Sequence, residues 1–142
     1  MKKILLVGFG NEYRKDDGLG IKLLDLIEGE FDKIKIQELT FDMAEIIKNY
    51  DIVIFVDASL EGKEISFRKI SEKCTFSPLT HHTSCEELLI WTKALYGKTP
   101  EFYLLSIKGY DFDFGEELSE EAKKNLEKGL KFLKRFIKGL NE

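Results

Sequence analysis

Several signatures that identify common protein classes are missing from this sequence of 142 residues. No apolar run approaches the roughly 20 residues that a membrane span needs, and the apolar segment after the Met-Lys-Lys start is too short for the core of a signal peptide. We therefore expect a cytoplasmic protein with no membrane partner. The formal charge of −4 and the lack of a basic stripe argue against nucleic acid as a partner.

The few cysteines and histidines do not form a known motif. Cys74 and Cys85 belong to no Cys-x-x-Cys pair, and no histidine has zinc-finger spacing, which excludes a zinc ribbon. The Gly-x-Ser-x-Gly, His-Glu-x-x-His and Ser-His-Asp patterns are also absent, so neither an acyl-enzyme nor an ordinary zinc protease is indicated. One alternative remains for Cys85, because a thiol near a histidine pair at a helix start can become a nucleophile.

Internal repeats, low-complexity tracts and linkers are absent as well. The composition, with 43% hydrophobic and 34% charged residues, is typical of a soluble globular protein. A chain of this length can bury a sizeable core. We therefore expect residues 1–142 to form a single domain.

The first twenty residues are the stretch around which the rest of the chain can be arranged. Residues 4–7 are a short apolar run bounded by glycine, which predicts a strand buried on both faces. A glycine-rich turn follows at 8–11, and Asp16 and Asp17 then stand at the start of an amphipathic helix. Both carboxylates are thus expected at the carboxyl end of a central strand, where open α/β sheets bind ligands. The alternative is that they only cap the helix.

A dinucleotide fits this turn poorly. Tyr13 stands where the Gly-x-Gly-x-x-Gly pattern needs its third glycine, and the two acids would repel a pyrophosphate. Acids grouped at a strand end suit a cation or a general base instead. Nucleotide binding through the glycine turn stays as a secondary alternative.

The remaining segments alternate between strand and helix patterns. They predict strands at 33–39, 52–56, 64–70 and 102–107, and helices at 42–50, 85–96 and 119–140. Asp42 with Glu45, and Ser84 with Glu87, have the spacing of capping boxes. This order predicts a three-layer α/β/α sandwich with a mainly parallel sheet of about five strands, in which 64–70 is an added strand at an edge.

Three groups far apart in the sequence are expected at one rim of this sheet. Asp57 directly follows the strongly apolar strand, and His81 and His82 stand together in the loop before a helix. Structural alternatives are a turn-stabilising role for Asp57 and solvent exposure for the histidines. With Asp16 or Asp17, however, these residues form a set of two carboxylates and an imidazole, which suits Zn²⁺, Ni²⁺ or Mn²⁺ with positions left open. The set indicates metal-assisted hydrolysis or metal recognition.

In this order and spacing, the motifs resemble those of the hydrogenase maturation endopeptidases. That family removes the C-terminal extension from the large subunit of nickel-iron hydrogenases once nickel is in place. The resemblance covers nearly the whole chain. It is carried by LVGFGN at 6–11, DDGLG at 16–20, VDA at 56–58, His81-x-x-Ser84 before a helix, and GEELS at 115–119.

The resemblance implies an endopeptidase that acts on nickel carried by its substrate, the large-subunit precursor. Asp17, Asp57 and His81 would contact that nickel, with His82 in place of His81 if the loop shifts by one residue. Asp16 would take a proton during the reaction. An aspartyl protease mechanism and a metal-assisted one both stay open. The alternative function is a non-catalytic, chaperone-like module that binds the precursor without cutting it.

The chain departs from the family pattern in one place. Many relatives have a glycine-rich turn before the second helix, whereas this sequence has Leu39-Thr40-Phe41-Asp42. These residues form a bulkier wall. If that turn admits the substrate tail, the preferred hydrogenase partner differs from that of other family members.

Overall fold

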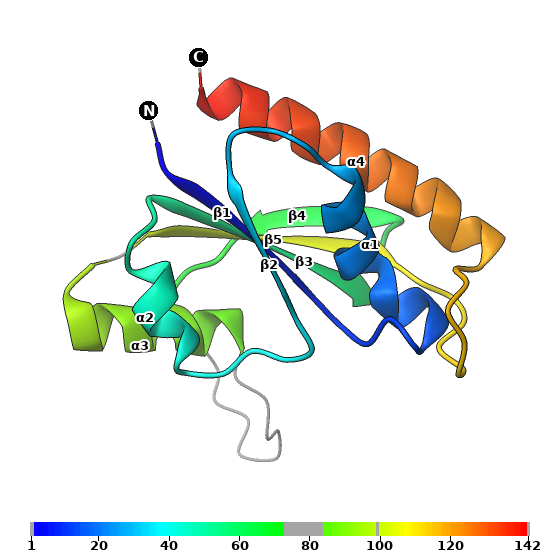
Figure 1. The fold of residues 1–142 in the computed structure, drawn as a ribbon, viewed down its shortest axis with the longest axis horizontal. Coiled ribbons are helices and arrows are strands. Elements are labelled where there is room, and N and C mark those ends of the chain that lie inside the picture. The colour runs from blue at the N-terminus through cyan, green and yellow to red at the C-terminus, as the bar shows by residue number, and fades with distance from the viewer. Residues whose placement is uncertain (1, 73–83, 99, 142) are drawn as a thin grey trace.

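In the computed structural model, which describes residues 2–72, 84–98 and 100–141, a five-stranded sheet lies between two layers of helices (Figure 1). The strand order is β2-β1-β3-β5-β4. All neighbouring strands are parallel except β4, which is antiparallel to β5 at one edge. The predicted three-layer α/β/α sandwich is therefore confirmed. The strands are β1 (Ile4–Phe9), β2 (Asp32–Ile36), β3 (Ile52–Ser59), β4 (Ile65–Lys69) and β5 (Glu101–Lys108).

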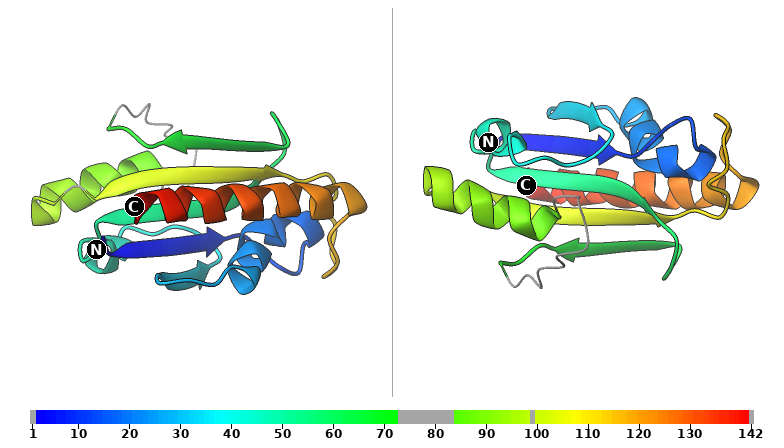
Figure 2. Two further views of the ribbon diagram at one scale, coloured as in Figure 1. Left: turned by 90° about the horizontal axis from the view of Figure 1, so that it is seen from above. Right: turned by 90° about the horizontal axis from the view of Figure 1, so that it is seen from below.

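Each face of the sheet is covered by two helices. Helices α1 (Leu19–Leu26) and α4 (Glu120–Leu140) lie on one face, and α2 (Met43–Ile47) and α3 (Cys85–Tyr96) lie on the other (Figure 1). Figure 2 shows α4 running along the strands for much of the length of the sheet. Of the helices in the described ranges, none combines the length and the apolar character needed to cross a bilayer.

Strand β3 is central because its side chains are apolar on both faces. Ile52, Ile54 and Val56 pack toward α1 and α4, whereas Val53 and Phe55 pack toward α2 and α3. All five are essentially excluded from water. Such a continuous apolar run is stable only where helices cover both faces of the sheet, as the sequence predicts.

Three predicted boundaries differ clearly from the structure. Strand β3 runs to Ser59 rather than ending at residue 56, so Asp57 lies within it. Strand β2 ends at Ile36 rather than at residue 39. Helix α2 is shorter than predicted, and the Asp42–Glu45 capping box does not form, because Asp42 has helical backbone angles and its carboxylate accepts a hydrogen bond from Thr40. By contrast, Ser84 caps α3 as expected, with its Oγ accepting from the Glu87 amide at 3.1 Å.

Helix α1 approaches β3 most closely at Gly20. A Cβ atom at this position would lie 2.2 Å from the carbonyl oxygen of Val56. No side chain fits at that distance, so the helix can lie this close only because residue 20 is a glycine. The contact fixes the start of α1, and with it the Asp16–Asp17 pair, relative to the end of β3.

This contact predicts a large effect for Gly20→Ala. The added methyl would push α1 away from the sheet, and we expect the free energy of unfolding to fall by at least about 3 kcal/mol. The matched control is Gly139→Ala in α4, where a Cβ would meet nothing within 4 Å. Because alanine favours helix, this control should gain about 0.5–1 kcal/mol. Urea denaturation measures both, and equal stabilities would contradict the close contact.

Candidate functional site at the carboxyl ends of β1 and β3

The candidate site lies where the chain leaves two neighbouring strands in different directions. Strands β1 and β3 are adjacent and parallel, with Gly8 opposite Val56 near their carboxyl ends. The helix after β1 covers one face of the sheet, and the helix after β2 covers the other. A crevice therefore opens beyond the ends of β1 and β3, which is the position at which parallel sheets of this type bind ligands.

A pocket of about 580 Å³ occupies this crevice, and we call it the acidic pocket. Because β2 ends early, the segment after it reaches the pocket. Leu39 of the predicted bulky turn is buried in its wall, whereas the ring of Phe41 packs against Trp91 of α3 with centroids 4.9 Å apart. The pocket is lined by Phe9, Gly10, Asn11, Asp17, Gln37, Glu38, Leu39 and Asp57.

Asp17 is held at this pocket by the loop after β1. It lies in a short 3₁₀ helix, η1 (Lys15–Gly18), that directly precedes α1. The amide of Asn11 donates to its Oδ2 at 2.8 Å. Gly10, with a φ of 139°, lets the backbone turn beneath it, because a Cβ there would lie 2.0 Å from the Asp17 carbonyl oxygen. The loop thus holds the Asp17 carboxylate against the pocket while leaving it partly exposed.

Asp57 reaches the same pocket from the carboxyl end of β3. Its Oδ1 accepts a hydrogen bond from the amide of Ala58 at 2.8 Å. Burial raises the pKa of Asp57 to about 7; the Ala58 hydrogen bond acts against this shift, and the nearby charge of Asp17 adds to it. The carboxyl group can therefore gain or lose a proton near neutral pH, which is the property that acid-base chemistry and cation binding both use.

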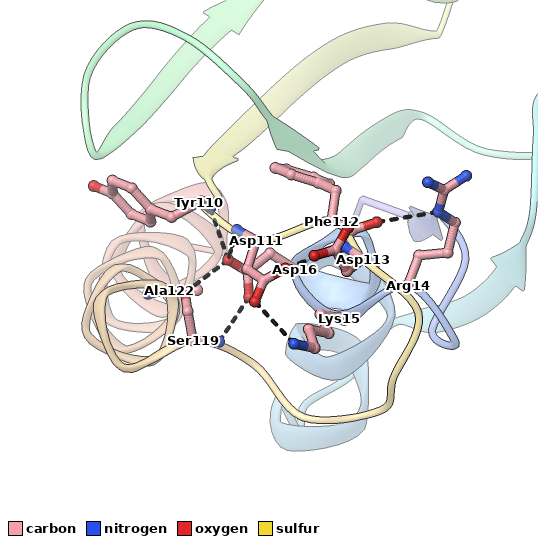
Figure 3. Close-up of polar contacts among 9 residues, drawn as sticks. All are labelled: Arg14, Lys15, Asp16, Tyr110, Asp111, Phe112, Asp113, Ser119 and Ala122. Atoms are coloured by element: carbon pink, nitrogen blue, oxygen red, sulfur yellow. Dashed lines mark hydrogen bonds and ion pairs between the residues drawn. The ribbon is translucent and has the colours of Figure 1, made fainter.

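Asp16 points away from this pocket, although it is the immediate neighbour of Asp17. Its side chain is fully buried and holds the loop between β5 and α4 (Figure 3). The amides of Tyr110 and Asp111 donate to Oδ2 at 2.7 and 2.9 Å, and the amide and hydroxyl of Ser119 donate to Oδ1 and Oδ2 at 2.8 and 2.7 Å. The carboxylate therefore joins two loops that are about a hundred residues apart in the chain.

This environment keeps Asp16 ionised. Burial alone would raise its pKa, but the hydrogen bonds from Ser119, Tyr110 and Asp111 lower the pKa below its ordinary value. A carboxylate in this state is a poor proton acceptor, so the geometry does not support the predicted role of Asp16 in proton transfer. It does not cap α1 either, because the residue before that helix is Gly18 and no side chain caps it.

A second pocket, of about 340 Å³, is lined by the same two carboxylates. We call it the arginine pocket, after Arg14. The side chains of Arg14, Leu60 and Phe112 come from three separate loops and form no motif, so the sequence did not predict them at this site. The pocket is lined by Arg14, Asp17, Asp57, Ala58, Leu60 and Phe112.

The structure thus brings two of the predicted site residues together. Asp17 and Asp57 share both pockets, whereas Asp16 is buried elsewhere. His81 and His82 lie outside the described residues, as does Cys74. Within residues 2–72, 84–98 and 100–141, no three His, Cys, Asp or Glu side chains are grouped so as to hold a metal ion. The predicted histidine ligand therefore stays a prediction.

Cys85 is not an activated nucleophile. It is buried at the start of α3, and that burial raises the pKa of its thiol to about 12, with further contributions from the charges of Glu86 and Asp57. The thiol is therefore protonated at neutral pH. The alternative that Cys85 attacks the substrate is contradicted by this environment.

Comparisons with known proteins show which solved structures share this fold. No family model matches the chain, and no curated protein matches its sequence. Among solved structures, it is similar to the NiFe hydrogenase maturation protease HybD from Thermococcus kodakarensis, at 25% identity and a TM-score of 0.73 over 94% of this chain and 98% of that one.

Two further solved structures give the same result. The hydrogenase maturating endopeptidase HybD from E. coli has a TM-score of 0.73 at 16% identity, covering 92% of this chain and 89% of that one. The NiFe hydrogenase maturation protease HycI from T. kodakarensis has a TM-score of 0.70 at 22% identity, covering 96% and 93%. These likenesses extend over nearly the whole length of each chain, and they show a shared fold.

The raised pKa of Asp57 predicts a pH-dependent stability. Between the ordinary pKa of 3.8 and about 7, the folded protein keeps a proton that the unfolded chain has lost, so stability falls as the pH rises through this range. We expect Asp57→Asn to match the wild type near pH 4 and to exceed it by about 2–4 kcal/mol at pH 8. Urea titrations across this range measure the difference, and a gap that is independent of pH would contradict the assignment.

The lowered pKa of Asp16 predicts the opposite behaviour. Asp16→Asn leaves buried amide donors without their charged acceptor, and we expect a loss of about 2–4 kcal/mol at neutral pH. Because the native carboxylate contributes stability only while it is ionised, this gap should close as the pH falls below about 4. Asp113→Asn, an exposed residue of the same loop, is the control and should stay within about 0.5 kcal/mol of the wild type.

Proposed function

Because this chain has the fold of the hydrogenase maturation proteases, we propose that it is an endopeptidase of hydrogenase maturation. It acts in the cytoplasm on the large-subunit precursor of a nickel-iron hydrogenase and removes the C-terminal extension. The nickel belongs to the precursor and is recognised there as part of the substrate.

The observation that carries this proposal is the pair of carboxylates at the crevice. Asp17 comes from η1, in the connection after β1, and Asp57 from the carboxyl end of the adjacent parallel strand β3, and the two line one pocket together with Glu38. Their proximity is reflected in the pKa of Asp57, which burial raises and which the charge of Asp17 raises further. A divalent cation entering the pocket would relieve this unfavourable concentration of negative charge. The pocket therefore favours a substrate that carries such a cation.

This arrangement would suit a metal-assisted hydrolysis. Asp17, Asp57 and the predicted ligand His81 complete the coordination of the precursor's nickel, and Asp57 releases its proton on binding the ion. The cation would polarise the scissile carbonyl while a water adds to the carbonyl carbon, and the amide bond would break as the departing amine takes up the proton that the water has given to a carboxylate. The proton of the attacking water passes to a carboxylate of the acidic pocket, because the hydrogen bonds of Asp16 leave it unsuited to accept one.

Substitution of the three proposed ligands tests this function. We expect Asp17→Asn, Asp57→Asn and His81→Ala each to lower the rate of processing by at least about 100-fold, because each removes a ligand or a proton acceptor. Mass spectrometry of a nickel-loaded precursor measures release of the C-terminal peptide. Asp25→Asn, an exposed substitution on α1, is the control and should keep the wild-type rate.

The outcomes separate the proposed enzyme from a binding module. A protein that binds the nickel-loaded precursor but releases no peptide would be the chaperone-like module, and the endopeptidase proposal would then be wrong. Wild-type processing by all three variants would also refute it. Circular dichroism of each variant shows whether it is folded, and so separates a loss of activity at the site from a loss of structure. For Asp57→Asn we expect lost activity together with a gain in stability.

A further inference from the structure

The proposed chemistry gives no role to the arginine pocket beyond the two carboxylates in its wall. This pocket shares Asp17 and Asp57 with the acidic pocket, but its other walls are Arg14, Leu60, Phe112 and Ala58. The two pockets therefore meet at the two carboxylates and differ in charge. One adds Glu38 to the acids, and the other adds a guanidinium.

The loop between β5 and α4 holds Arg14 in place. Its Nε donates to the carbonyl oxygen of Phe112 at 3.2 Å (Figure 3). Its guanidinium carbon lies 5.3 Å from the centre of the Phe114 ring. Across the described part of the chain, its two Nη groups form no hydrogen bond or ion pair. The side chain is thus oriented by one nitrogen while two others remain available to a ligand.

The chemistry of this pocket determines what can bind there. A guanidinium with two available Nη groups binds carbonyl or carboxylate oxygens through paired hydrogen bonds, and its positive charge disfavours a metal ion. Leu60, with 71% of its surface exposed, and Phe112 add an apolar wall. Such a site fits a peptide segment that carries no metal.

Resting on the proposed function, we propose that the arginine pocket binds the first residues of the C-terminal extension, directly after the cleaved bond. The nickel-bearing part of the precursor occupies the acidic pocket, and the scissile bond then lies at Asp17 and Asp57, between the two pockets. The Nη groups of Arg14 donate to main-chain oxygens of the extension, and Leu60 and Phe112 contact its side chains.

Asp16 is the positioning residue of this pocket. Its carboxylate holds the amides of Tyr110 and Asp111, and the backbone then leads directly to Phe112 and the carbonyl that orients Arg14. The adjacent acids therefore have separate tasks. Asp17 faces the reacting bond, while Asp16 holds the loop against which the extension binds.

The test compares precursors with extensions of different length. The wild type, Arg14→Ala and Arg14→Lys are assayed on a nickel-loaded precursor with its full extension and on one with the extension cut to a single residue. For the full extension, we expect Arg14→Ala to lower kcat/KM by about 10- to 100-fold and Arg14→Lys by less, because lysine keeps the charge but not the paired donors. The control Arg135→Ala, an exposed arginine on α4, should leave kcat/KM unchanged.

Extension length separates binding from a merely structural role. Shortening the extension should lower kcat/KM for the wild type but have little further effect on Arg14→Ala, since the contact is already lost. Equal losses for both lengths would mean that Arg14 only supports the loop, and would overturn the inference.

A binding measurement tests the peptide site without requiring cleavage of the precursor. A synthetic peptide with the sequence of the extension should inhibit the wild type and bind to it in calorimetry, about 10-fold more tightly than to Arg14→Ala. If the wild type cleaves no precursor yet binds this peptide through Arg14, the proposed function fails and the peptide site stands. If the wild type cleaves but the peptide binds both proteins equally, the peptide site is refuted and the function stands.

Discussion

The buried carboxylate of Asp16 is the interaction on which the arrangement of the site depends. A carboxylate without solvent contact is costly unless donors surround it, and here backbone amides and a hydroxyl from the loop between β5 and α4 supply them. The bond network joins the end of β1 to the end of β5, on either side of the central strand β3. Because Asp17 and Arg14 lie within two residues of Asp16, this group helps to position residues of both pockets.

Much of the fold could be predicted from the sequence because apolar patterning determines it. The runs at β1 and β3 are apolar without interruption, and only a sheet covered on both faces accommodates them. The less accurate predictions concern short polar segments. Asp42 has the spacing of a capping residue, but its own helical backbone angles turn the side chain toward Thr40. Spacing alone does not reveal such a competition between local hydrogen bonds.

The site could be predicted in part, for a similar reason. The carboxyl ends of parallel strands meet at one rim, so a side chain that ends β3 and one in the loop after β1 are brought together by topology, and Asp57 and Asp17 do line one pocket. The difference between Asp16 and Asp17 could not be predicted. It arises from donors 94 to 103 residues further along the chain, and neither spacing nor composition shows them. Arg14 and Leu60 were missed because loops place them.

The manner in which Asp16 binds its partners also determines which substitutions the loop between β5 and α4 can accept. At positions 110 and 111 the carboxylate contacts only main-chain amides, which every residue except proline provides. The hydrogen bonds of Asp16 therefore do not depend on which side chains stand at these two positions, although Asp111 also links the segment to η1 through its ion pair with Lys15 at 2.9 Å. Any substitution other than proline at these two positions can therefore change the surface of the loop without removing these hydrogen bonds, so the surface can vary while the scaffold is kept.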